Sequence, residues 1–172
     1  IEDDGDGVLT VPPGQHIVPS VVSGEADVSS AFALAALAAV AGHAHIRNFP
    51  LHSQQPDAAF VDLLRRMAVP ITLDSDGLQV GRAEQPLRPL SADVSGCPDL
   101  VPVLAVLCAL AEGRSRLFGA PHLRGKESDR IATSACLVRM LGRAVEETDD
   151  GLVIDGRPFV QADALTPLRF DA

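Results

Sequence analysis

The amino-acid sequence predicts an α/β fold made of tandem units, each with two helices and several strands. Stretches of strand-like alternation and of helical periodicity follow one another along the chain, and their order occurs twice. Matched residues mark the repeat, because Gly24 and Gly96, like Asp27 and Asp99, lie about 72 positions apart. We therefore predict a single domain, residues 1–172, that contains two copies of one supersecondary unit.

The composition is that of a globular protein with few aromatic side chains. Of the 172 residues, 47% are hydrophobic and 22% are charged, which is enough apolar material for a core. The chain has six Phe and no Trp or Tyr, so Ala, Leu and Val must fill that core. Scarce aromatics offer bases no stacking platform, and a net charge of -9 repels a phosphate backbone. We expect no nucleic-acid partner.

The apolar runs and the cysteines bear on location. The longest apolar runs are shorter than the roughly 20 residues that a membrane-spanning helix needs, so we expect no membrane partner. Three cysteines, odd in number and far apart, argue against a disulfide framework or a zinc site and favour the cytoplasm. The chain begins at Ile1 rather than Met and carries no leader, which leads us to expect a fragment.

Unit one is placed at residues 15–84. After strand-like pieces at residues 8–11 and 16–22, a turn rich in capping residues leads to a helix at 31–41 that ends at Gly42. This helix is apolar on nearly every side, which predicts neighbours on both sides. The later elements are a strand at 43–49, an amphipathic helix at 57–67, and a hairpin of strands at 69–73 and 78–82.

Unit two, residues 87–157, repeats this order. Its first helix is again strongly apolar and follows a Gly-x-x-Asp turn, as in unit one. Residues 158–172 are expected to be part of a third unit. The predicted elements of unit two are a strand at 89–94, a helix at 100–111, a strand at 115–118, a helix at 129–141, and strands at 144–147 and 152–154.

The loop before the second helix differs most between the units. In unit two it is the charged loop, residues 122–130, with the sequence His-Leu-Arg-Gly-Lys-Glu-Ser-Asp-Arg. The corresponding neutral loop of unit one, residues 51–57, is polar and lacks this cluster. Lys126 is the only lysine of the chain, and its ammonium is a compact point charge where guanidinium is a flat fork.

The position of the charged loop suits an anion. Ser128 or Asp129 can cap the following helix, whose N-terminus offers unpaired N–H groups and the positive end of the helix dipole. The sequence therefore predicts a site for a negatively charged ligand. The alternative is a solvated helix opening in which Lys126 and Arg130 lie one turn apart on an exposed face.

These residues resemble a known family. The run Arg-x-Lys-Glu-Ser-Asp-Arg-Ile at residues 124–131, the Pro-Asp at 98–99 before an apolar helix, and the Asp-x-Ser-Ser-Ala at 27–31 are similar to 3-phosphoshikimate 1-carboxyvinyltransferases, the EPSP synthases. The resemblance implies an inside-out α/β barrel of βαβαββ units, with helices inside and sheets outside. It makes the chain part of a C-terminal lobe, whose partner would be the N-terminal lobe of the same enzyme.

The resemblance also implies an activity. Members of this family transfer the enolpyruvyl group of phosphoenolpyruvate to the 5-hydroxyl of shikimate 3-phosphate and release phosphate through a tetrahedral adduct. They use no metal and no organic cofactor. Because the N-terminal lobe and an Asp-His-Arg motif expected after Ala172 are missing, we expect this chain alone to fold without turning over.

Three residues inherit catalytic roles from the resemblance. Asp99 matches the base that accepts the hydroxyl proton, and a carboxylate at a helix start suits that task. Glu127 matches the acid that protonates the methylene carbon of phosphoenolpyruvate and later takes a proton back. Lys126 matches the residue that contacts the shikimate hydroxyl and the reacting centre.

Further residues are expected to bind substrate together with Lys126 and Asp99. Arg130 matches the residue that grips phosphoenolpyruvate, where a guanidinium fork suits a carboxylate or a phosphate. Asp27 is at the Asp-x-Ser-Ser position near the same centre. His122 stands where many members carry an Asn that contacts the shikimate phosphate.

Two other functions compete with this interpretation. A UDP-N-acetylglucosamine enolpyruvyl transferase would share the fold and the donor, but the Lys-Glu-Ser-Asp-Arg run is typical of the shikimate enzyme. A non-catalytic repeat domain used for assembly would make the charged loop a surface feature. His43 and His45 lie two residues apart on a strand, but no third ligand is evident, so we predict no metal site.

Overall fold

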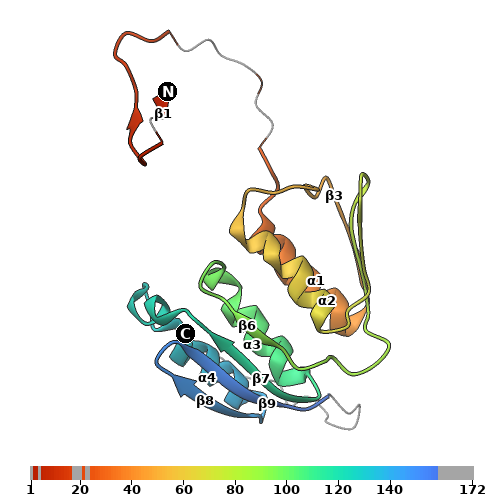
Figure 1. Cartoon of the computed structure of the whole chain (residues 1–172). Helices are drawn as coiled ribbons and strands as arrows, with labels where there is room; N and C mark the ends of the chain where they lie inside the picture. Colours follow the sequence, from red (N-terminus) through yellow and green to blue (C-terminus); the bar gives the residue numbers. More distant parts are fainter. Residues whose placement is uncertain (1, 4, 17–20, 22–23, 159–172) are drawn as a thin grey trace.

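The structure, a computed structural model, describes residues 2–3, 5–16, 21 and 24–158 and has a mixed α/β architecture (Figure 1). Near the N-terminus, β1 (Glu2–Asp3) and β2 (Leu9–Thr10) form a small antiparallel pair. This pair is drawn in red in Figure 1, away from the helices. The rest of the described chain forms two sheets with helices packed on them.

The elements of unit one form a three-stranded antiparallel sheet with two helices. The strand order is β3-β5-β4, and α1 packs on β3 and β5 while α2 packs on β4. The elements are α1 (Val28–Ala41), β3 (His43–Arg47), the 3-10 turn η1 (Pro56–Ala59), α2 (Phe60–Arg66), β4 (Ile71–Asp74) and β5 (Gly77–Gly81).

The elements of unit two form a four-stranded sheet of order β6-β7-β9-β8, in which only the β6–β7 pair is parallel. Its last three strands repeat the order and direction of β3-β5-β4. The elements are β6 (Ser91–Asp93), η2 (Pro98–Leu100), α3 (Val101–Leu110), β7 (Gly113–Phe118), η3 (Pro121–Gly125), α4 (Arg130–Met140), β8 (Ala144–Thr148) and β9 (Gly151–Gly156).

The first helices of the two units, α1 and α3, pack against each other between the two sheets (Figure 1). Helices therefore lie inside and sheets outside, which confirms the predicted fold class. The core is mostly Ala, Leu and Val, as the composition requires. Phe60 is its aromatic centre, stacked on Phe32 at 5.2 Å between ring centroids and in edge contact with Phe49 at 5.6 Å.

Helix α1 departs from the prediction in two ways. It begins at Val28, three residues before the predicted start at 31, because the Asp27 carboxylate accepts hydrogen bonds from the backbone N–H groups of Ser29 and Ser30. Leu34 and Leu37 are 57% and 62% exposed, so the predicted neighbours on both sides of the helix are not found among the described residues. In the described part of the chain, α1 packs on β3, β5, α3, η1 and η2, and these neighbours leave Leu34 and Leu37 exposed.

Most other boundaries differ from the prediction by one or two residues, and two helices also differ by short 3-10 turns. The helices predicted at 57–67 and 100–111 each begin with one, η1 and η2, before the α-helical turns follow. Most of the strand predicted at 16–22 and nearly all of the third unit predicted at 158–172 lie outside the described residues. The division into units at 15–84 and 87–157 therefore stays a prediction.

Candidate active site

The charged loop lies at the N-terminal end of α4, held by an apolar anchor on each side. Leu123, within η3, and Ile131, in the first turn of α4, are both fully buried. Between them, Asp129 caps α4 by accepting a hydrogen bond of 3.0 Å from the N–H of Ala132. The loop between the anchors, residues 124–128, is exposed.

Arg130 joins three of the predicted site residues in one cluster. Its Nη1 lies 2.5 Å from Asp99 Oδ1, which reaches over from η2. Its Nη2 and Nε lie 2.6 Å and 2.9 Å from Glu127 Oε1. The Arg130 side chain is only 25% exposed, whereas those of Asp99 and Glu127 are 52% and 68% exposed. The arginine therefore sits beneath two carboxylates that face solvent.

The charges of this cluster stabilise one another. Hydrogen bonds from Arg130 lower the pKa of Glu127, and nearby positive charges act in the same direction. The same contact with Glu127, followed by that with Asp99, raises the pKa of Arg130 above its usual value. Glu127 is thus ionised at neutral pH while it is paired. An incoming anion would have to displace at least one carboxylate from Arg130.

Lys126 has a different environment from the two arginines of the loop. Arg124 is paired with Asp129 at 2.9 Å, and Arg130 is paired as described. Lys126 is exposed and forms no ion pair within the part of the chain that the structure describes. Its ammonium is therefore the positive charge of the loop that a ligand can reach without breaking a contact. His122 is likewise exposed.

Asp99 also faces a cavity between the two units. It belongs to η2 rather than acting as a helix cap, in contrast to Asp27 of unit one. A cavity of about 250 Å³ separates it from the start of α1 and from the neutral loop. The lining residues are Ser29, Gln55, Pro56, Asp57, Gly96, Pro98 and Asp99. The candidate site thus lies where the two units meet.

Asp27 lies at the start of α1 and is fully engaged in capping. Its carboxylate accepts from the Ser30 hydroxyl at 2.6 Å and from the Ser29 N–H at 3.0 Å, and these hydrogen bonds lower its pKa. No contact joins it to Asp99 or Arg130 in the structure as described. The Asp-x-Ser-Ser motif is thereby explained locally, and the substrate-binding role of Asp27 stays a prediction.

Sequence reasoning missed the polar network of the neutral loop. Asp57, only 9% exposed, accepts a short hydrogen bond from the Ser29 hydroxyl. The side-chain oxygen of Gln55 accepts from the N–H of Val28 at 3.1 Å, and its Nε2 donates to Ala26 O at 2.9 Å. The available signal was a Gln-x-Asp run at the repeat position of the charged loop.

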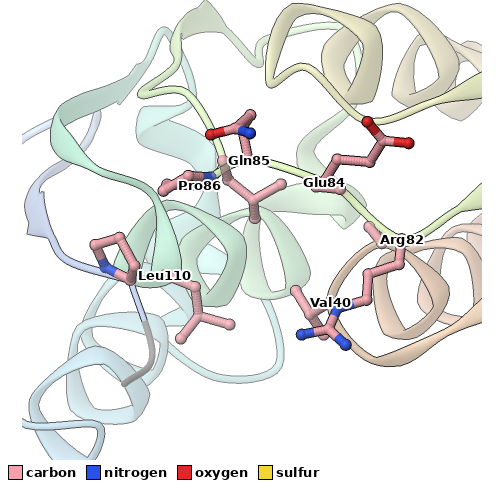
Figure 2. A pocket seen from close by; sticks show the side chains of 10 residues that line it. Val40, Arg82, Glu84, Gln85, Pro86 and Leu110 are labelled. Carbon is pink, nitrogen blue, oxygen red and sulfur yellow. The ribbon is translucent and has the colours of Figure 1, made fainter. Parts of the chain in front are cut away.

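A second cavity lies at the opposite ends of the helices and does not suit an anion. It has a volume of about 510 Å³ and is bordered by the ends of α1 and α3 and by the link between the units (Figure 2). The C-terminal ends of helices carry the negative end of the dipole, and Glu84 lines the cavity beside Arg82. This cavity is therefore not part of the candidate active site.

The described residues contain no group of three His, Cys, Asp or Glu side chains able to hold a metal ion. His45 Nε2 instead lies 3.4 Å from Asp76 Oδ2. Across the same residues, no helix has the length and apolar character needed to cross a membrane. The charges that the structure brings together at the candidate site are one arginine between two carboxylates and, next to Glu127 in the sequence, the exposed Lys126.

Comparison with known proteins decides the family. The sequence model of the family described as EPSP synthase (3-phosphoshikimate 1-carboxyvinyltransferase) matches residues 1–167. The chain belongs to the EPSP synthase family. Its sequence is 41% identical over 154 residues to the 3-phosphoshikimate 1-carboxyvinyltransferase of Methanothrix thermoacetophila, covering 89% of this chain and 36% of that protein.

A second relative gives the same result. The 3-phosphoshikimate 1-carboxyvinyltransferase of Syntrophobacter fumaroxidans is 40% identical over 150 residues, covering 86% of this chain and 35% of that protein. The chain thus spans about a third of the length of the curated EPSP synthases it matches.

Solved structures agree on the fold. The EPSP synthase from Acinetobacter baumannii superposes with a TM-score of 0.61 at 24% identity, covering 77% of this chain and 32% of that one. The enolpyruvyl transferase NikO from Streptomyces tendae superposes with a TM-score of 0.52 at 20% identity, covering 76% and 30%. At these identities the likeness supports the fold alone.

Proposed function

We propose that this chain supplies the charged-loop wall of the active site of a 3-phosphoshikimate 1-carboxyvinyltransferase. The reaction transfers the enolpyruvyl group of phosphoenolpyruvate to the 5-hydroxyl of shikimate 3-phosphate and releases phosphate. The observation that carries the proposal is the Arg130 cluster, which brings Asp99 and Glu127 together beside Lys126 in a chain of this family. Contacts from the remaining length of the enzyme would complete the site.

The proposed chemistry uses two carboxylates for proton transfer. Asp99 accepts the proton of the 5-hydroxyl as its oxygen attacks C2 of phosphoenolpyruvate, while protonated Glu127 donates to the C3 methylene. This gives the tetrahedral adduct. Glu127 then takes a proton back from the new methyl group as the C2–O bond to phosphate breaks. The proton held by Asp99 leaves with the departing phosphate, so both carboxylates regain their starting protonation. The enolpyruvyl product and inorganic phosphate result, without any metal or organic cofactor.

The two cations hold the anionic reactants. Arg130 grips the carboxylate or phosphate of phosphoenolpyruvate with its guanidinium fork, and Lys126 contacts the attacking hydroxyl and the reacting centre. Fixed charges that act without reorganising are the expected source of much of the rate enhancement. Because Glu127 is ionised while paired with Arg130, the exchange of Arg130 onto the substrate also frees Glu127 to take up the proton it must donate.

Other parts of the proposal extend from the same family. His122 would approach the phosphate of shikimate 3-phosphate and Asp27 would lie near the same centre, while the enzyme works in the cytoplasm with its N-terminal lobe as partner. A UDP-N-acetylglucosamine enolpyruvyl transferase is disfavoured, because relatives at 40% and 41% identity carry the name of the shikimate enzyme. A purely structural repeat domain would not require an unpaired ammonium beside a paired arginine.

The test is phosphate release by the complete gene product that contains this chain. We expect release from phosphoenolpyruvate that requires shikimate 3-phosphate. Release that requires UDP-N-acetylglucosamine instead would favour the rival transferase. No release with either acceptor, from a protein that melts cooperatively, would contradict the proposed function.

A further inference from the structure

We propose that Arg124 is a positioning residue that sets the place of Lys126 and Glu127 without binding a substrate itself. The inference rests on the proposed function for its catalytic consequence, but its geometric part stands on the contacts of Arg124. These contacts are separate from the Arg130 cluster, because the hydrogen bonds and ion pairs of Arg124 go to Asp129, Thr148 and Glu147 and not to Asp99 or Glu127.

Arg124 closes the exposed part of the charged loop. Its Nη1 donates to Asp129 Oδ2 at 2.9 Å, so the residue that begins this segment is tied to the residue that ends it. Residues 125–128, which include Lys126 and Glu127, lie between the two ends of this link. The loop is therefore held by a side-chain bridge where it has no buried side chain of its own.

The same guanidinium fixes the loop to the sheet. Its Nη2 donates to the carbonyl oxygen of Thr148 at 2.7 Å, and its Nη1 lies 3.8 Å from Glu147 Oε2. Both partners are at the end of β8, which pairs with β9 and cannot follow a moving loop. Asp129 is fixed in turn, because its other carboxylate oxygen caps α4.

Arginine is the residue type that this bridge needs. One planar guanidinium donates in two directions, to Asp129 and to Thr148. The compact ammonium of a lysine would reach at best one of these two acceptors with good geometry. With both terminal nitrogens engaged, Arg124 offers a ligand little binding capacity. The repeat supports this interpretation, because the corresponding residue of the neutral loop is His52, which is exposed and forms no such bridge in the described contacts.

The chain offers a matched control at Arg139. Its Nη2 donates to Glu147 Oε1 at 3.0 Å, so it shares a partner with Arg124, but it lies on α4 and does not contact residues 125–128. Exposed ion pairs of this kind contribute little to global stability. R124K, R124Q and R139Q should therefore all fold, and their effects should separate at the loop.

The geometric test is amide hydrogen exchange of this chain. We expect R124Q and R124K to speed exchange of the Ala132 and Thr133 amides, which donate to Asp129 at the end of the loop, by about tenfold or more through local opening, while R139Q leaves them unchanged. Exchange of these amides that is equal in wild type, R124Q and R124K would overturn the proposal. The proposal would also be overturned if R139Q sped exchange as strongly as R124Q, because the lost contact with Glu147, which both arginines share, would then explain the faster exchange.

The functional test uses the complete gene product. We expect kcat of R124K and R124Q to fall by about 10- to 100-fold, the size of effect that follows a misplacement of about 1 Å, while KM and the melting temperature change little. A raised KM at unchanged kcat would make Arg124 a substrate ligand and overturn the positioning role, as would an unchanged kcat. A wild-type protein without turnover would contradict the proposed function instead, and the exchange data would still decide the geometry.

Discussion

The two units connect the same two segments, one through hydrogen bonds and the other through an ion pair. In each, the segment that leads into the second helix reaches back to the start of the first helix. The neutral loop does so through Gln55, which accepts from the N–H of Val28, and through Asp57, which accepts from Ser29. The second helix of unit two does so through the ion pair of Arg130 with Asp99.

The difference separates a structural contact from an exchangeable one. Asp57 is almost fully buried, and the hydrogen-bonding capacity of the Gln55 amide is used by backbone groups and Glu25, so breaking these contacts leaves polar groups unsatisfied. Asp99 and Glu127 are exposed, and water or a ligand can replace either at Arg130. The contacts of the loop in unit one are therefore suited to hold the fold, whereas those of unit two leave charges exposed to solvent.

Matched substitutions at Lys126 and Gln54, its counterpart in the neutral loop, should show the largest difference between the units. We expect Lys126→Met to lower kcat for phosphate release by about 10²- to 10³-fold, because the charge that we propose contacts the reacting centre is lost. Gln54→Met should stay within about twofold, because a surface substitution removes no such charge. Steady-state assays of the complete gene product measure both, and equal losses would remove the distinction between the loops.

Stability should show the reverse order. Asp57→Ala should lower the free energy of unfolding by about 1–3 kcal/mol, because it removes the buried carboxylate that accepts the part-buried hydrogen bond from Ser29. Asp99→Ala should cost less than about 1 kcal/mol, because its ion pair is exposed. Urea unfolding of this chain measures both values. A larger loss at Asp99 than at Asp57 would contradict the structural role of the neutral loop.

The two capping aspartates should respond to pH in parallel but with different strength. Hydrogen bonds lower the pKa of Asp27 and of Asp129 below the ordinary value of 3.8. Each therefore stabilises the fold above that value, and the contribution disappears as pH falls through the lowered pKa. Melting curves should show a larger loss at neutral pH for Asp129→Asn than for Asp27→Asn, because only Asp129 also pairs with Arg124. The difference in melting temperature between each variant and wild type should vanish at low pH, where the wild-type aspartate is protonated. A difference that grew as the pH fell would contradict the stabilising role of the ionised carboxylate.

Much of the fold could be predicted because its signals are local. Alternation and helical periodicity located the strands and helices, and the recurrence of Gly and Asp revealed the repeat before any contact was known. The start of α1 was missed because capping by Asp27 draws Val28 into the helix. The exposure of Leu34 and Leu37 could not be predicted, since burial depends on which neighbours a helix has.

The residues of the candidate site could be proposed from the sequence, but their pairing could not. The charge cluster and the single lysine pointed to the charged loop. The start of a helix directly after this loop predicted a binding site for an anion. The contact of Arg130 with Asp99 joins residues 31 positions apart and depends on how α3 packs against α4. The role of Asp57 was missed for the same reason, because Ser29 lies 28 positions away.

The central claim is that the Arg130 pairs of unit two exchange for ligand anions while the contacts of unit one do not. Calorimetric titration of the complete gene product with phosphoenolpyruvate tests it most directly. Glu127→Gln removes an intramolecular competitor for Arg130, so its Kd should be about threefold lower than that of wild type, the size of a weakened surface ion pair. Glu25→Gln, which alters an acid held by Ser53 and Gln55 in unit one, should leave Kd unchanged. A Kd for Glu127→Gln equal to or higher than that of wild type would contradict the account.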